Sequence, residues 1–155
     1  MWKPFERFRA LDPEAQKLFG HAVALLPLLA VSLRFLGFKK TKQSLQNRLP
    51  PISTQVMSRD QVAKVVEKTC RMVRAGAHYG IGHPTCLTES LAVWYLLKRQ
   101  DIPAQLRIGV RKVTEKFEAH AWVEFEGAAV NQPDEQHQHY AAFESEFSGV
   151  PGEKS

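Results

Sequence analysis

The segment HPTCLTESLAVWYLLKRQ, residues 83–100, decides the fold. After Pro84 it contains neither Gly nor Pro, it is dense in Leu, Ala and Val, and it ends in Lys98 and Arg99, which suit the negative end of a helix dipole. Because apolar residues cover nearly every side of this predicted helix, we expect it to be central and buried. The sequence Asp-Ile-Pro at 101–103 ends it.

Cys86 lies in the first turn of this helix, directly after a loop rich in Gly, His and Tyr. A helix N-terminus carries partial positive charge and several N–H groups without intrahelical partners. That setting lowers the pKa of a thiol, and the same N–H groups stabilise an oxyanion during acyl transfer. Cys86 is therefore the candidate nucleophile.

Beyond residue 103 the apolar residues recur at every second position. Residues 104–110 and 119–125 both alternate, as half-buried strands do. Glu126-Gly127 is a hairpin-type turn, and residues 128–132 are the expected returning strand. Helices followed by a small antiparallel sheet give the fold class α+β.

His120 is the candidate base, 34 residues after Cys86 along the chain. The strand alternation places it with Trp122 and Glu124, on the face opposite to the apolar side chains. Cys86 and His120 meet if the helix packs on that His/Trp/Glu face. A helix-borne thiol followed by a strand-borne imidazole matches the order of a thiol–imidazole pair.

The front of the chain is predicted to be helical. Asp12 as N-cap and Pro13 at the first position start a helix that runs into the apolar stretch 18–38. Polar interruptions leave an uncharged core shorter than the ~20 residues that a bilayer span needs. We therefore expect a buried or interfacial helical hairpin, bent at Pro27, with peripheral membrane contact as an alternative.

Residues 38–56, which include two adjacent prolines, are expected to be a connector. The next helix begins near Ser58 or Asp60 and ends at Ala75-Gly76, with Cys70 packed on its apolar stripe. The last residues, from about Ser145, have the composition of a disordered tail.

Composition limits the function classes. The 155 residues suit one domain, and the net charge of +5 is not concentrated in one basic stripe, so no nucleic-acid partner is expected. Two cysteines without a C-x-x-C motif argue against a disulfide scaffold and against structural zinc. We expect a cytoplasmic protein without cofactor or metal.

The chain resembles the transglutaminase-like leader peptidases of lasso-peptide biosynthesis over about residues 15–143. The resemblance rests on Cys86-Leu87 opening a helix, on Leu-Arg-Ile-Gly-Val at 106–110 and on Ala-His-Ala-Trp-Val-Glu at 119–124. It implies a transglutaminase- or papain-like fold and a Cys–His–Asp peptidase that removes the leader from a precursor peptide. It also implies two partners, a small leader-recognition protein and an ATP-dependent cyclase.

The third catalytic residue departs from that family's pattern. Where the family tends to have Asp, this chain has Gln132, preceded by Asn131, and the nearest acid is Asp134. A two-residue turn at 126–127 would put Asn131 diagonal to His120, whereas a three-residue turn with a bulge would put Gln132 opposite it. An amide orients an imidazole but does not stabilise imidazolium as a carboxylate does.

The prediction is one transglutaminase-like cysteine peptidase domain over residues 1–145, with a helical region and connector at 1–56, a catalytic core at 57–145 and a disordered tail at 146–155. Two alternatives remain. One is another acyl transfer at the same site, such as transamidation. The other is a binding module that has lost its chemistry, which the missing aspartate favours.

Overall fold

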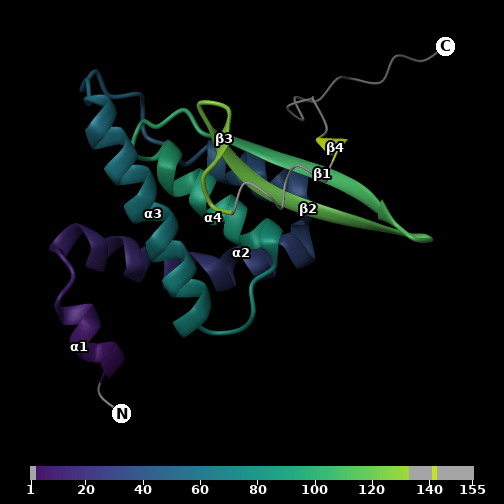
Figure 1. The fold of residues 1–155 in the computed structure, drawn as a ribbon, viewed down its shortest axis with the longest axis horizontal. Coiled ribbons are helices and arrows are strands. Elements are labelled where there is room, and N and C mark those ends of the chain that lie inside the picture. The colour runs from purple at the N-terminus through teal and green to yellow at the C-terminus, as the bar shows by residue number, and fades with distance from the viewer. Residues whose placement is uncertain (1–2, 133–140, 143–155) are drawn as a thin grey trace.

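The structure is a computed structural model, and residues 3–132 and 141–142 are described. In these residues four helices precede a four-stranded antiparallel sheet (Figure 1). The elements are α1 (Lys3–Arg9), α2 (Pro13–Gln46), α3 (Arg59–Tyr79), α4 (Cys86–Lys98), β1 (Gln105–Val113), β2 (Lys116–Phe125), β3 (Ala128–Ala129) and β4 (Ala141–Ala142). This arrangement confirms the α+β prediction. The predicted tail 146–155 lies outside the described residues.

The start of α2 follows the sequence prediction. The Asp12 side chain caps the helix by accepting a hydrogen bond from the Ala15 N–H at 2.8 Å, and Pro13 takes the first helical position. That position needs no donated N–H, so proline costs nothing there. Lys68 of α3 forms ion pairs with Asp12 and Glu14, which ties the start of α2 to α3.

The break in α2 is at Gly37, not at Pro27. Gly37 has φ 76° and ψ 172°, a conformation outside the helix that only glycine adopts readily. The hydroxyls of Ser32 and Thr41 lie 2.9 Å apart, although nine residues of continuous helix would separate them by ~13.5 Å. The chain therefore folds back at Gly37 into a second helical arm. Residues 38–46, predicted as connector, belong to that arm.

Helix α3 begins where the sequence indicated, near Ser58, and Ser58 and Gln61 form a capping box there. It continues to Tyr79, past the predicted end at Gly76. A Cβ at Gly76 would lie 3.0 Å from the Ala22 Cβ, so this glycine is needed for close contact between α3 and α2. Cys70 is buried as predicted, and burial raises the pKa of its thiol to about 11.

Helix α4 is the centre of the core. Every residue from Leu91 to Leu97 is buried, and the core cluster joins α4 to α2, to α3 and to Val123 of β2. Figure 1 shows α2 behind α3 and α4, with the sheet on another side of α4. The strand order is β3-β2-β1-β4.

The face of the sheet that α4 covers differs from the expectation. The residues packed with α4 include Val123, Phe125 and Leu106, whereas Trp122 is buried outside this cluster. Because side chains alternate along β2, α4 packs on the face opposite to His120. The packing of α4 on the His/Trp/Glu face, through which the sequence analysis expected Cys86 and His120 to meet, is therefore absent. A hydrogen bond from Ser90 to Ala121 instead joins α4 to this part of β2.

The reversal at Gly37 gives a stability prediction. Gly37→Ala forces a side chain into positive φ and should lower the free energy of unfolding by about 1–3 kcal/mol. Gly20→Ala is the matched control, because Gly20 lies in the helical part of α2 with no atom near its missing Cβ. It should be neutral or stabilising by up to ~1 kcal/mol. Denaturant unfolding measures both, and equal stability of the two variants would contradict the fold-back.

Candidate active site

Cys86 is the first residue of α4 and is half-buried. The Thr85 side chain caps the helix by accepting a hydrogen bond from the Thr88 N–H at 3.3 Å. The N–H groups of Cys86 and Leu87 have no carbonyl one turn back inside the helix. The sequence therefore places this thiol where the helix dipole and backbone donors act on it, as the analysis of residues 83–100 predicted.

Beyond the end of β3, the main-chain groups on this edge of β2 form hydrogen bonds with side chains instead of with a neighbouring strand. Strand β3 ends at Ala129, and the last main-chain bond of this hairpin runs from the Val130 N–H to the Val123 carbonyl at 2.9 Å. Two residues before Val123 in β2, the Ala121 carbonyl accepts a hydrogen bond from the Ser90 hydroxyl at 2.9 Å. Ser90 is fully buried on α4, so α4 meets β2 at this edge.

This hydrogen bond links the helix that begins at Cys86 to the strand that carries His120. Ser90 lies one turn after Cys86, so both project from the same side of α4, with ~6 Å between them along the axis. His120 directly precedes Ala121, the residue that Ser90 contacts. Ser90 therefore bonds to β2 at the residue next to His120, although the body of the helix packs on the opposite face.

Asn131 has a structural role at this edge. Its side-chain oxygen accepts a hydrogen bond from the Val123 N–H at 2.8 Å, where a partner strand would offer a carbonyl. Its side-chain N–H group donates to the Ser90 hydroxyl at 3.0 Å. Asn131 thus joins β2 to α4, and the chain bends away from the sheet over residues 130–132.

Gln132 is the residue that contacts His120. Its amide N–H donates to the Ala121 carbonyl at 3.4 Å, which fixes the orientation of the amide because a carbonyl only accepts. The amide oxygen then faces the His120 Nε2. Nε2 must therefore carry the proton, and Nδ1 is the basic nitrogen of the neutral ring.

The turn that precedes these residues combines parts of both predicted alternatives. Glu126 and Gly127 have φ values of 50° and 80°, and Glu124 pairs with Ala129, so the turn has two residues. The tight turn was expected to bring Asn131 to His120, yet Gln132 makes that contact. The reason is that the Asn131 side chain ends the ladder early and lets the chain bend. Asp134 lies outside the described residues.

The other face of His120 is held by a chain of contacts. The His120 and Trp122 rings stack with their centroids 6.2 Å apart. The Trp122 indole N–H donates to Glu124 at 2.9 Å, and Arg107 forms an ion pair with the same carboxylate at 3.0 Å. Arg107 is opposite Trp122 in the sheet register. This chain fixes Trp122, the residue against which the imidazole rests.

Two further charged residues lie near the start of α4. Burial raises the pKa of Glu89, in the first turn of α4, while the charge of Arg74 opposes this shift. The Arg74 guanidinium also donates to the Asn131 main-chain carbonyl at 3.4 Å. Arg74 therefore ties α3 to the bend beside Gln132.

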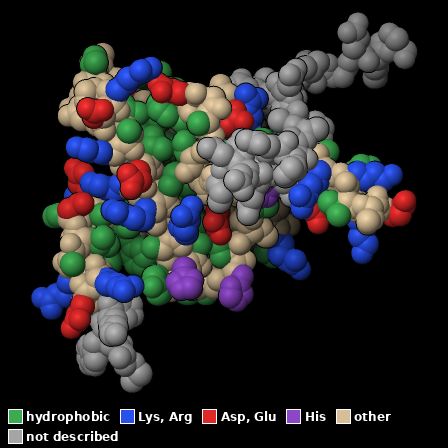
Figure 2. Space-filling model, in the orientation of Figure 1, with side chains coloured by type: hydrophobic (Ala, Val, Ile, Leu, Met, Phe, Trp, Pro, Cys, Tyr) green, Lys and Arg blue, Asp and Glu red, His purple; other side chains and the backbone are tan. Residues whose placement is uncertain are grey.

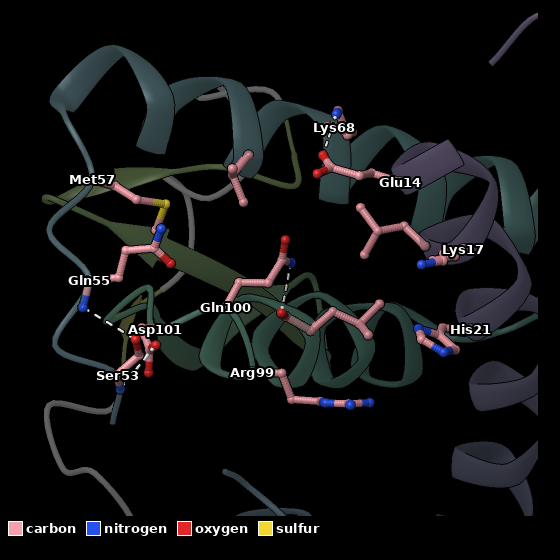
Figure 3. A pocket seen from close by; sticks show the side chains of 13 residues that line it. Glu14, Lys17, His21, Ser53, Gln55, Met57, Lys68, Arg99, Gln100 and Asp101 are labelled. Carbon is pink, nitrogen blue, oxygen red and sulfur yellow. Dashed lines mark hydrogen bonds and ion pairs between the residues drawn. The ribbon is translucent and has the colours of Figure 1, made fainter. Parts of the chain in front are cut away.

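A cavity of about 520 Å³ lies at the other end of α4, between α2, α3 and the residues before α3 (Figure 3). Its lining includes Gln100, which hydrogen-bonds to the Leu96 carbonyl, and the side chains of Lys17 and Arg99. Leu96 is ~15 Å along α4 from Cys86. The lining contains none of the four candidate catalytic residues, so this cavity is separate from the site.

Ser90 is the important residue that the sequence analysis missed. A signal for it exists, because Ser90 is a small polar residue directly before an uninterrupted apolar run in a buried helix. Such a residue must find hydrogen-bond partners, and here they are Ala121 and Asn131. Over residues 3–132 and 141–142, no group of three or more His, Cys, Asp or Glu is arranged to hold a metal.

Comparison with known protein families matches residues 25–145 to the Transglutaminase-like superfamily. This match covers most of the chain and both candidate catalytic positions, and the chain belongs to that superfamily. No curated protein and no solved structure matches the chain in the corresponding comparisons. The superfamily is consistent with cysteine-dependent peptidase or acyl-transfer chemistry.

The network at the β2 edge gives a second prediction. Ser90→Ala removes one acceptor and one donor from a fully buried position and should lower the free energy of unfolding by about 1–3 kcal/mol. Thr54→Ala, at an exposed hydroxyl side chain, is the control and should change it by less than ~0.5 kcal/mol. Thermal unfolding compares them, and an unchanged Ser90→Ala variant would contradict the role of this network.

Proposed function

We propose that this protein is a cysteine peptidase that cleaves the leader from a ribosomally made precursor peptide, as in lasso-peptide biosynthesis. The observation that carries the proposal is the hydrogen bond between Gln132 and His120 at the strand edge to which Ser90 fastens the helix of Cys86. A thiol at a helix N-terminus, an imidazole on the strand to which that helix bonds and an amide that contacts the imidazole are the parts from which a thiol peptidase is built.

In the proposed mechanism, the Nδ1 atom of His120 takes the proton of the Cys86 thiol, and the thiolate attacks the scissile carbonyl. The Cys86 N–H, at the positive end of α4, stabilises the oxyanion. The imidazolium then gives its proton to the leaving amine, and the C–N bond breaks. His120 next takes a proton from water, and the resulting hydroxide releases the acyl group from the sulfur.

The substrate assignment rests on the sequence resemblance over residues 15–143. We propose that the protein works in the cytoplasm with a small leader-recognition protein and an ATP-dependent cyclase. Mass spectrometry of a precursor peptide incubated with the protein and the recognition partner tests this. Hydrolysis at the leader–core junction, abolished in Cys86→Ala, is the expected result. A product whose mass shows transamidation would replace the peptidase with another acyl transferase.

Alkylation kinetics test the thiol itself. Iodoacetamide should modify Cys86 at neutral pH, because the thiol is half-buried at a helix N-terminus and the proposed base, His120, takes its proton. Cys70 is an internal control, since burial and its pKa of about 11 keep it protonated and inaccessible at neutral pH. Peptide mass spectrometry resolves the two sites.

The matched variant is His120→Ala, which should slow alkylation of Cys86 and leave Cys70 unmodified. Ordinary titration of Cys86, unaffected by His120→Ala, would mean that the free protein holds no thiol–imidazole pair. The binding module without chemistry would then be the better description. Gln132 in place of an acid is the observation that favours this second candidate.

Replacement of Gln132 tests the electrostatic part of the site. Gln132→Glu keeps the side-chain length but places a negative charge beside the His120 Nε2, so it should stabilise imidazolium and, with it, the thiolate. We expect the pH profile of Cys86 alkylation to move down by about one unit or more. Gln132→Ala, the control, should slow alkylation without that downward move. An unchanged profile in Gln132→Glu would show that residue 132 does not act on His120.

A further inference from the structure

The outer face of α2 carries an apolar stripe that no described residue covers. Leu28, Val31 and Phe35 are 66%, 56% and 77% exposed, and their spacing of three and four residues places them on one side of the helix. Leu36, beside them, is 53% exposed. The opposite side of α2, with Leu26 and Leu29, is buried in the core. Large apolar side chains gathered on an exposed face indicate a contact surface.

Helix α2 is apolar enough to cross a membrane by length and composition alone. An 18-residue window has a mean hydropathy of 1.8, and only 17% of that window is buried, unlike the core helix of a globular protein. However, the inner face of α2 packs against α3 and α4, and Gly76 of α3 touches Ala22. A spanning α2 would have to leave these partners. The geometry therefore suits a helix that lies along a membrane surface.

In the sequence segment that contains the stripe, every Lys, Arg, Asp or Glu position is basic. Residues 15–59 contain no Asp or Glu and seven basic residues, which are Lys17, Arg34, Lys39, Lys40, Lys42, Arg48 and Arg59. The rest of the chain contains the other 14 of the 21 Lys and Arg and all 16 Asp and Glu, so its net charge is −2. The positive charge of the protein is therefore concentrated in the segment that contains the stripe. Arg34 lies next to Phe35 in α2, Lys39 and Lys40 follow the reversal at Gly37, and all three are exposed.

Helix α3 shows the contrasting pattern of an ordinary solvated face. Figure 2 shows basic and acidic side chains interspersed over α3. Its exposed residues include Asp60 and Glu67 as well as Lys64 and Arg71. The absence of acids from residues 15–59 is therefore particular to α2 and its surroundings.

We propose that the outer face of α2 binds an anionic membrane surface, with Leu28, Val31 and Phe35 in the interface and Arg34, Lys39 and Lys40 near the lipid phosphates. Basic residues beside an apolar helix face are the combination that such surfaces attract. A second copy of this chain is a poorer occupant, because it would bring the same seven uncompensated cations against the first.

This surface is independent of the proposed peptidase chemistry. Helix α4 has α2 on one side and β2 on another, and Ser90, one turn after Cys86, lies where α4 meets β2. A membrane on the outer face of α2 therefore leaves the candidate active site on the part of the molecule away from the bilayer.

Vesicle co-sedimentation of the full chain tests the proposal. The probes are vesicles of phosphatidylcholine alone and of phosphatidylcholine mixed with phosphatidylglycerol. We expect binding to the anionic vesicles and much weaker binding to the neutral ones. Leu28→Ser with Phe35→Ser should weaken binding at least about tenfold, because two apolar side chains leave the interface. Lys39→Gln with Lys40→Gln should weaken it about fivefold for each lysine.

Phe117→Ser is the matched control, because Phe117 is 75% exposed but lies on β2. It should bind like the unchanged protein, and circular dichroism checks that each variant is folded. Failure to bind anionic vesicles, or an equal loss in Phe117→Ser, would overturn the proposal. So would a dimer in analytical ultracentrifugation that Leu28→Ser with Phe35→Ser dissociates, because the stripe would then join two copies. Resistance to extraction by alkaline carbonate would indicate a spanning helix and would also overturn it.

Discussion

The candidate site depends on the buried hydroxyl of Ser90. It donates to the Ala121 carbonyl and accepts from Asn131, so one side chain joins α4, β2 and the bend that follows β3. Without a hydrogen-bond partner, each of these buried polar groups would be costly. Because all are satisfied together, the helix that begins at Cys86 is joined to the strand and bend that carry His120 and Gln132. The site is therefore a joint between elements and not a feature of one loop.

The neutral amide of Gln132 defines the chemistry that this joint offers. It fixes the tautomer of His120 without adding a charge, and the contacts from Arg107 through Glu124 to Trp122 hold the other side of the ring. Orientation of the imidazole is thus strongly determined, while stabilisation of imidazolium rests on weaker, uncharged contacts.

Local patterns in the sequence predicted what depends on local rules. The Asp12 cap, the helix that begins at Cys86 and the presence of a hairpin turn at Glu126-Gly127 follow from propensities and backbone geometry, whereas the length of that turn was left open. The reversal at Gly37 and the length of α3 depend instead on contacts between helices, which no periodicity records. Whether Asn131 or Gln132 contacts His120 depends on where the pairing between β2 and β3 ends. Asn131 lies at that end, and its side chain is bonded to Ser90 of α4, which is distant in the sequence.

The reversal at Gly37 also bears on the order in which the protein folds. It brings Ser32 and Thr41 together across nine residues, a loop whose closure costs little conformational entropy. The β1–β2 hairpin is similarly local. The contacts of Ser90 close loops of 31 and 41 residues, so they are expected to follow the local ones. The catalytic geometry is then a late product of folding, and a chain arrested early would be compact but without an assembled site.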